Sequence, residues 1–136
     1  PVAVITNSSL LSLEEVRIAV SEANLVVTTF NAVSKEIFEK VNRPHPNIKI
    51  EDIILGLINF RNGFKGKIFL EIMVIKGIND SLKEIRKLKE AIEKINPDKI
   101  HLTLPVRLPS EEWVKSPSLN KLNKMKEILG DRCEIV

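Results

Sequence analysis

Short apolar segments alternate with helical patterns along the whole chain. Val and Ile dominate the short segments, and apolar residues between them recur every three or four positions. This alternation predicts strand–helix–strand units with right-handed crossovers, and therefore a parallel sheet covered by helices. The expected strands are Val2–Thr6, Leu25–Phe30, Lys67–Ile75, Lys99–Leu104 and Cys133–Val136.

Capping residues and chain breakers set the expected helix bounds. The prolines of "NRPHP" separate the second helix from the third, because proline disfavours helix in the residue before it. The fourth helix carries an apolar stripe of Leu82, Ile85, Leu88, Ile92 and Ile95. The first helix is expected from a capping box of Ser12 and Glu15 to about Glu22, and the second from Ser34 to about Val41. The third is expected from about Glu51 to Phe60, with Asn62 and Gly63 as its stop. A capping box of Ser81 and Glu84 begins the fourth, and the fifth runs from Ser118 to Gly130.

The chain is sized for a single α/β domain over residues 1–136. Of its 136 residues, 43% are hydrophobic, which suffices for a core. A parallel sheet is either open and doubly wound or a closed or partial barrel, and both kinds bind ligands at the carboxyl ends of the strands. No apolar run approaches the roughly 18 residues of a membrane span, and no secretory signal opens the sequence, so we expect no membrane partner and a cytoplasmic setting.

The composition offers no metal motif and no self-contained catalytic motif. Cys133 is a lone cysteine, and His45 and His101 are too far apart in sequence for the usual ligand spacing. The net charge of +3 comes from alternating signs, as in "LKEIRKLKEAIEK", which is typical of a solvated helix face rather than of a nucleic-acid site. Glycine-rich phosphate loops and nucleophile elbows are also missing. Any chemistry must therefore be carried by a cofactor.

Polar residues follow nearly every expected strand. Thr6–Ser9 come after the first, Thr29 and Asn31 end the second, Lys76–Asp80 follow the third, and Arg107 follows the fourth. Turn formation and helix capping are the ordinary roles of such residues. Thr28 and Thr29 fit those roles less well, because they fall inside an apolar strand.

Side-chain parity places four polar residues on matching strand faces, because residues two apart share a face. In "KIHLTLPVRLP", His101, Thr103 and Arg107 fall on one face, and Glu71 lies in the middle of the preceding strand. If these faces line a barrel interior, the four residues surround a polar cavity in which Glu71 pairs with Arg107 or His101. A purely structural buried network is the alternative.

Five fragments in order, "VITNSSL", "TTFNA", "NRPHP", "IMVIKGIND" and "HLTLPVRLP", resemble the central and C-terminal part of radical S-adenosylmethionine (radical SAM) enzymes over almost the whole chain. The resemblance is closest to an uncharacterised branch distantly related to archaeal wyosine tRNA-modifying enzymes. It implies the C-terminal portion of a partial TIM-type (β/α) barrel. S-adenosylmethionine would lie across the strand ends, with its methionine moiety on a 4Fe-4S cluster.

The resemblance also implies roles for polar residues at the strand ends. Thr29 and Asn31 would contact the ribose or the methionine carboxylate, and the loop with Asn7 and Ser8 would lie beside the cofactor. Ser8 stands where the family usually has glycine, and Asn31 stands where it usually has an acidic residue.

Two later strands complete the implied site. Asn79 and Asp80 would help to hold the adenosyl part of the cofactor. The strand that runs from His101 to Arg107 would close the adenine side or face the substrate, as would Glu71 and Thr103.

The cluster motif of the family, C-x-x-x-C-x-x-C, is absent from this sequence. We therefore expect the first strand, Val2–Thr6, to be the third strand of a larger barrel, with the cluster held by the parent protein alone. Cys133 cannot replace three thiolates. The edge of Val2–Thr6 is expected to pair with another chain, to be covered by a rearranged segment or to be disordered.

The expected function is that of a portion of a radical SAM enzyme. The parent would cleave S-adenosylmethionine to a 5′-deoxyadenosyl radical, and this chain alone would be inactive. A peptide, a tRNA base and a small metabolite all stay open as substrates. A non-enzymatic α/β half-barrel for binding or interaction is the alternative. A flavodoxin-like receiver or nucleotide-binding domain is a third possibility, although no acidic cluster follows the first strand.

Overall fold

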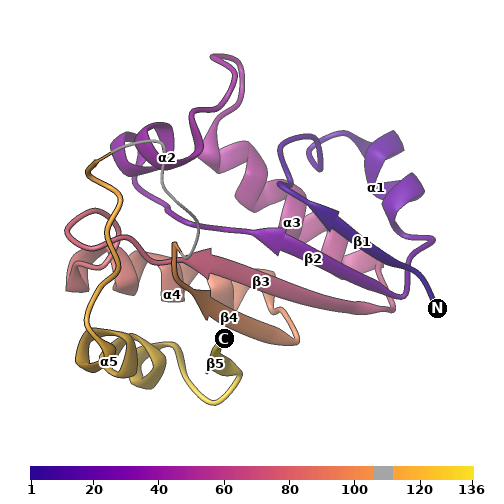
Figure 1. Cartoon of the computed structure of the whole chain (residues 1–136). Helices are drawn as coiled ribbons and strands as arrows, with labels where there is room; N and C mark the ends of the chain where they lie inside the picture. The colour runs from indigo at the N-terminus through magenta and orange to yellow at the C-terminus, as the bar shows by residue number, and fades with distance from the viewer. Residues whose placement is uncertain (106–111) are drawn as a thin grey trace.

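A five-stranded, all-parallel sheet forms the centre of the chain (Figure 1). The computed structural model describes residues 1–105 and 112–136. The strand order is β1-β2-β3-β4-β5, so the order never reverses as it does in a doubly wound sheet. The predicted α/β class and partial (β/α) barrel are confirmed. The strands are β1 (Ala3–Thr6), β2 (Leu25–Thr29), β3 (Lys67–Met73), β4 (Lys99–Thr103) and β5 (Cys133–Ile135).

Helices fill the crossovers between successive strands. One crossover, from β2 to β3, holds two helices, because the prolines of the "NRPHP" segment end the first of them. The helices are α1 (Glu14–Val20), α2 (Lys35–Asn42), α3 (Ile50–Gly63), α4 (Leu82–Ile95) and α5 (Leu119–Leu129).

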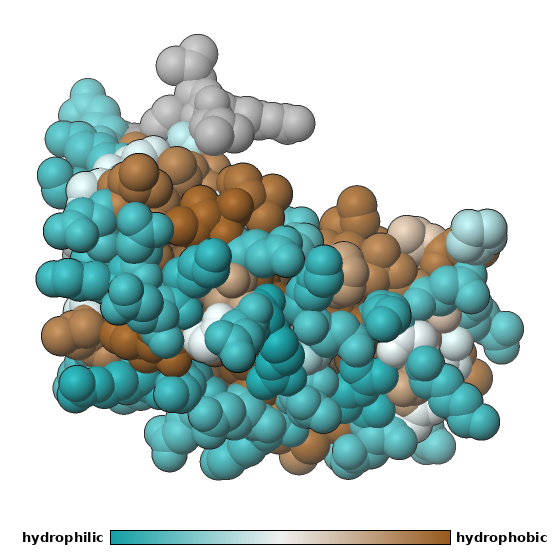
Figure 2. Space-filling view, turned by 90° about the horizontal axis from the view of Figure 1, so that it is seen from below, coloured by the Kyte–Doolittle hydropathy of each residue, from teal (hydrophilic) through white to brown (hydrophobic). Residues whose placement is uncertain are grey.

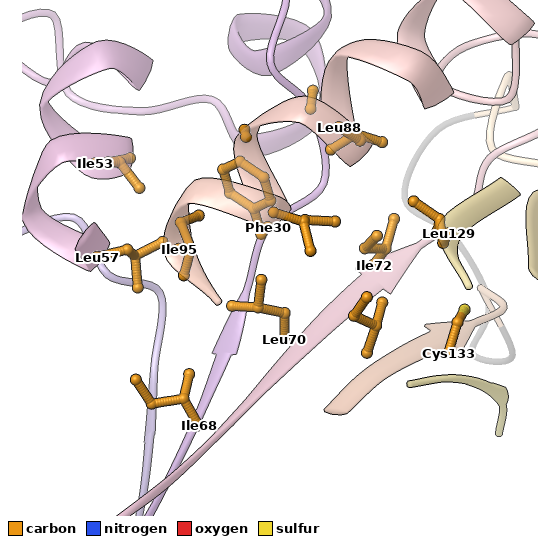
Figure 3. Packing of buried hydrophobic residues seen from close by; sticks show 14 of the residues in the cluster. Phe30, Ile53, Leu57, Ile68, Leu70, Ile72, Leu88, Ile95, Leu129 and Cys133 are labelled. Atoms are coloured by element: carbon orange, nitrogen blue, oxygen red, sulfur yellow. The ribbon is translucent and has the colours of Figure 1, made fainter. Parts of the chain in front are cut away.

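The helices cover one face of the sheet, as the alternating burial along β3 shows. Ile68, Leu70 and Ile72 are fully buried and point toward the helices, where they join the main hydrophobic cluster (Figure 3). Phe69 and Glu71 point the other way and are half-buried. We call the uncovered side the helix-free face. It carries Ala3, Ile5, Leu25, Val27, Thr29, Lys67, Phe69, Glu71, Met73, Lys99, His101, Thr103 and Glu134.

The strand β1 forms one edge of the sheet and, within the described residues, pairs with β2 alone. Its Ile5 is 82% exposed on the helix-free face. Seen from below, polar side chains dominate the lower part of the molecule, and apolar ones gather toward the upper edge, the side that faces the viewer in Figure 1 (Figure 2).

Helix α3 ends at Gly63, as the expected stop at Asn62 and Gly63 predicts, but two other expectations about the helices are wrong. Ser12 and Glu15 form no capping box, because the chain first makes turns that bury Leu11, and Leu13 becomes the N-cap of α1. In the apolar stripe of α4, Leu82 is 48% exposed while the other four residues are buried.

Glu84 makes only half of its expected capping box. The Ser81 hydroxyl accepts from the Glu84 N–H, as predicted, but the Glu84 carboxylate does not return to Ser81. It accepts instead from the backbone N–H groups of Val33 and Ser34 and from the Ser34 hydroxyl, at the start of α2. A carboxylate at a helix N-terminus is favourably placed. Glu84 thus joins α4 to α2 with a side chain that is 1% exposed.

An ion pair closes the opposite, amino edge of the sheet. Arg61 Nη1 lies 2.8 Å from Asp98 Oδ2, which also accepts from the Ile68 N–H. Arg61 Nη2 donates to the carbonyls of Phe64 and Gly66. Burial alone would raise the pKa of Asp98, but the hydrogen bond from Ile68 and the guanidinium outweigh it and hold the pKa below its usual value.

Gly56 of α3 offers a test of close packing. A Cβ there would lie 2.7 Å from the carbonyl carbon of Leu11 and 2.8 Å from the Ser12 nitrogen, whereas a Cβ at Gly63 of the same helix meets nothing within 4 Å. We expect Gly56→Ala to lower the free energy of unfolding by about 1–3 kcal/mol. Gly63→Ala, the matched control, should leave it unchanged or raise it by up to about 1 kcal/mol. Urea unfolding measures both, and equal effects would contradict the packing.

Asp98 should make stability depend on acid pH. Its pKa is lowered in the folded chain, so its contribution is present above the unfolded value of about 3.9 and is lost as pH falls through the folded value. Because the carboxylate is partly exposed, we expect Asp98→Asn to cost about 1–2 kcal/mol at pH 7. In urea unfolding, the wild-type advantage should be constant at neutral pH and shrink as the pH falls below the unfolded value of about 3.9. An advantage independent of pH would show that the charge does not matter.

Candidate functional site at the carboxyl edge

The six predicted cofactor residues all lie at the carboxyl edge of the sheet, where β1, β2 and β3 end. Their side chains nevertheless differ in availability. Ser8, Asn31 and Asn79 are buried, whereas Asn7 is exposed and Thr29 is half-buried. The chain itself uses the buried ones.

Two asparagine side chains tie the ends of β2 and β3 together. Asn79, which is 0% exposed, accepts from the Ile75 N–H through Oδ1 and donates through Nδ2 to the carbonyls of Asn31 and Met73, at 2.8–2.9 Å. The Asn31 Oδ1 accepts from the Met73 N–H at 2.9 Å. These bonds replace strand pairing just where the strands stop, so both residues act first as structural clamps.

Ser8 adopts a left-handed backbone conformation, with φ of 65°. Glycine takes this conformation without steric cost, which gives a physical reason for the glycine that is usual at this position in the enzymes that the sequence resembles. The Ser8 hydroxyl is buried and forms a hydrogen bond with the hydroxyl of Thr28. Ser8 and Thr28 therefore fix the β1–α1 loop against β2.

The remaining predicted groups shape turns while staying accessible. The Asn7 Oδ1 accepts from the Ser9 N–H, and the Asp80 Oδ1 accepts from the Gly77 N–H. Gly77 has φ of 76°, so glycine suits the turn. The ordinary role of such residues as turn formers therefore holds for both, and neither is buried.

A polar row crosses the helix-free face. Strand register places Thr29 beside Glu71, Glu71 beside His101, and His101 beside Glu134. His101 Nε2 lies 3.9 Å from a Glu134 oxygen, and the Glu71 carboxylate forms no hydrogen bond or ion pair with any described residue. Thr103 follows on the same face, so parity was read correctly for the described residues. Arg107, the fourth predicted member, lies outside them.

Beside this row, the helix-free face carries an aromatic and a cationic group. The rings of Phe69 and His101 meet edge to face with centroids 5.3 Å apart, and Lys99 Nζ lies 5.7 Å from the centre of the Phe69 ring. Lys99 also lies 3.6 Å from Glu134. The face thus combines carboxylates, an imidazole and a flat apolar surface within a few strand spacings.

Sequence reasoning missed an extended segment, residues 112–117, that runs past the carboxyl edge (Figure 1). Lys40 Nζ of α2 lies 4.8 Å from the centre of the Trp113 ring, and the Lys115 carbonyl accepts from the Lys76 N–H at 2.8 Å. The segment has no periodic pattern, so its position could not be inferred from the sequence. It bounds the site between α2 and the β3–α4 loop.

The described residues do not fit an iron–sulfur cluster. They hold no group of three or more His, Cys, Asp and Glu side chains that could bind a metal ion. Cys133 is 0% exposed and lies near Leu129 in the core (Figure 3), where burial raises the pKa of its thiol to about 11. A thiol with that pKa is not a ready ligand. None of the helices in the described part of the chain is long and apolar enough to cross a membrane.

Comparison with curated proteins gives two relatives that match nearly the whole chain. The "UPF0026 protein MJ1312" of Methanocaldococcus jannaschii is 34% identical over 131 residues, which are 96% of this chain and 41% of that protein. A "GTPase Obg" of Brachyspira hyodysenteriae is 34% identical over 135 residues, which are 99% of this chain but 20% of that protein. The chain spans at most about two-fifths of either relative. No protein-family model matches it.

Solved structures are similar over nearly the whole chain. A domain of the pyruvate-formate lyase-activating enzyme from Bacteroides vulgatus superposes with a TM-score of 0.77 and 18% identity, covering 98% of this chain and 80% of that one. A radical SAM methyltransferase from Sphaerobacter thermophilus gives 0.74 and 17%, covering 98% and 39%. The chain has the fold of radical SAM enzymes. At these identities the likeness concerns the fold alone.

The clamp role of Asn79 can be tested directly. Asn79→Ala leaves the Ile75 N–H and two carbonyls without partners, so we expect a loss of about 3 kcal/mol in the free energy of unfolding. Asn120→Ala, on the exposed surface of α5, is the matched control and should change it by less than about 0.5 kcal/mol. Urea unfolding decides. A small loss for Asn79→Ala would mean that the amide is free for a ligand.

Proposed function

We propose that this chain is the cofactor- and substrate-facing portion of a radical SAM enzyme. The fold, shared with solved radical SAM enzymes over 98% of the chain, is the observation that carries the proposal. The parent protein would cleave S-adenosylmethionine reductively to a 5′-deoxyadenosyl radical. The single domain of residues 1–136 would then be a fragment of a larger barrel.

The chain would contribute binding and orientation. Its accessible groups at the carboxyl edge, Thr29, Asn7 and Asp80, are suited to the hydroxyl, amine and carboxylate groups of S-adenosylmethionine. Asn31 and Asn79 would support these groups from behind rather than touch the cofactor, since their oxygens and the Asn79 amide are engaged within the chain. The 4Fe-4S cluster does not fit the described residues, so its thiolates would belong to other parts of the parent protein.

The substrate would lie on the helix-free face. Glu71, His101 and Thr103 would face it, because they line the uncovered side of the two strands next to the cofactor edge. The Glu71 carboxylate would accept a hydrogen bond from the substrate, and the Phe69 ring would give the substrate a flat surface to pack against. The parent protein would carry out this chemistry in the cytoplasm.

A non-enzymatic binding domain is the second candidate. One observation favours it: three of the six expected cofactor residues, Ser8, Asn31 and Asn79, are buried and use their side chains within the chain. Such a domain would bind its partner on the helix-free face or by pairing at the β1 edge with another chain.

Binding of S-adenosylmethionine separates the two candidates. In NMR titrations of the chain, the cofactor should shift amides of residues 28–31 and 77–80, near Thr29 and Asp80. Thr29→Val should weaken binding by about fivefold or more, because one hydrogen bond is lost at nearly constant shape. Asp80→Asn keeps the acceptor that holds the Gly77 turn and tests the charge alone.

The control for charge is Asp131→Asn, an exposed change in the turn before β5. It should leave binding unchanged. Shifts confined to the amino edge, around Arg61 and Asp98, would contradict the proposed orientation. Absence of any saturable shift at millimolar cofactor would favour the non-enzymatic domain.

A further inference from the structure

A pocket lies beside the carboxyl edge, between the end of β1, the helix α2 and the loop that follows α2. Its volume is about 200 Å³. Phe38, Ile48 and Ile53 give it apolar walls, and Phe38 and Ile53 belong to the hydrophobic core. For scale, a dry cavity of roughly 150 Å³ holds a benzene ring. The pocket is thus large enough for one small ring.

Asn42, the last residue of α2, lines this pocket and has an unsatisfied acceptor. Its Oδ1 is buried and, among the buried side-chain nitrogens and oxygens of the described residues, it alone has no hydrogen-bond partner. Folded proteins contain few such atoms, because each one costs free energy on the order of 1–3 kcal/mol. A donor that reaches Asn42 from the pocket would remove that cost.

The surroundings of Asn42 favour an uncharged donor. The carboxyl end of α2 is the negative end of the helix dipole and favours a donor there. The apolar walls of the pocket oppose a charged ligand, because a charge would lose its hydration there. His45 Nδ1 accepts from the Asn47 N–H at 3.2 Å, which leaves the ring proton on Nε2 as a donor for a ligand acceptor.

We propose that this pocket binds a small neutral cyclic amide. Its N–H donates to Asn42 Oδ1, and its ring packs against Phe38 and Ile53. The last torsion of an asparagine side chain is broad, so a small rotation turns the buried oxygen toward the ligand. The site shares Asn7 with the proposed cofactor residues, but the contacts proposed for the amide, Asn42, Phe38 and Ile53, are not among them.

Two probes that differ in one donor test the proposal. 2-Pyrrolidinone has an amide N–H beside a small apolar ring, and N-methyl-2-pyrrolidinone lacks the N–H. In NMR titrations of the chain, 2-pyrrolidinone should give saturable shifts of the Asn42 side-chain amide and of backbone amides 42–48, with an affinity at least about fivefold higher than that of the methylated probe. Equal affinities, or shifts elsewhere, would overturn the proposal.

A substitution gives the matched protein arm. Asn42→Leu removes the unsatisfied acceptor at similar volume, so 2-pyrrolidinone should bind at least about tenfold more weakly while the melting temperature stays the same or rises. Asn59→Leu, on the exposed side of α3, should leave binding unchanged. Unchanged binding of 2-pyrrolidinone to a folded Asn42→Leu variant would refute the proposal. The two-probe comparison requires no variant and decides the question even if Asn42→Leu does not fold.

Discussion

Burial of one face of the parallel sheet is the constraint on which the rest of the structure depends. Parallel sheets usually have both faces covered, but here the helices cover one. The difference between the covered and the uncovered face fixes the register in which the strands pair. A slip of β3 by one residue would exchange Leu70 with Glu71 and place a carboxylate in the hydrophobic cluster, at a cost of several kcal/mol. The polar row on the helix-free face is thus tied to the same packing that buries the core.

The carboxyl edge depends on hydrogen bonds between loops rather than on the core. Asn79 reaches back to the end of β2, and Glu84 reaches the start of α2. Both connect segments about 50 residues apart, so the β2–α2 loop is held from two sides. Thr29, which lies just before this loop, is consequently presented from a fixed backbone, which is what a binding group requires.

The sequence predicted the elements that depend on periodicity and missed those that depend on which loops meet. The shared face of Glu71, His101 and Thr103 follows from a period of two, and the structure bears it out for these residues. The engagement of Asn31 and Asn79 could not be read from their positions after strands, since the same positions suit a ligand. Ser12 does not cap α1, because the backbone of Leu11 packs against Gly56 of α3 and the Leu11 side chain is buried. This is a tertiary contact, which the local sequence pattern does not reveal. The Asn42 pocket also escaped notice, because "NRPHP" signals only a break.

Ser8, at the carboxyl edge, has a left-handed backbone conformation that disfavours residues other than glycine. A non-glycine residue in the left-handed region costs on the order of 1–3 kcal/mol. The buried hydrogen bond between the hydroxyls of Ser8 and Thr28 returns about 1 kcal/mol, and the turns that follow place Leu11 in the core. The hydroxyl of Thr28 thus offsets part of the cost of a serine at this position. This coupling gives a role to the first threonine in "TTFNA": Thr28 supports the loop from the helix side, whereas Thr29 lies on the helix-free face.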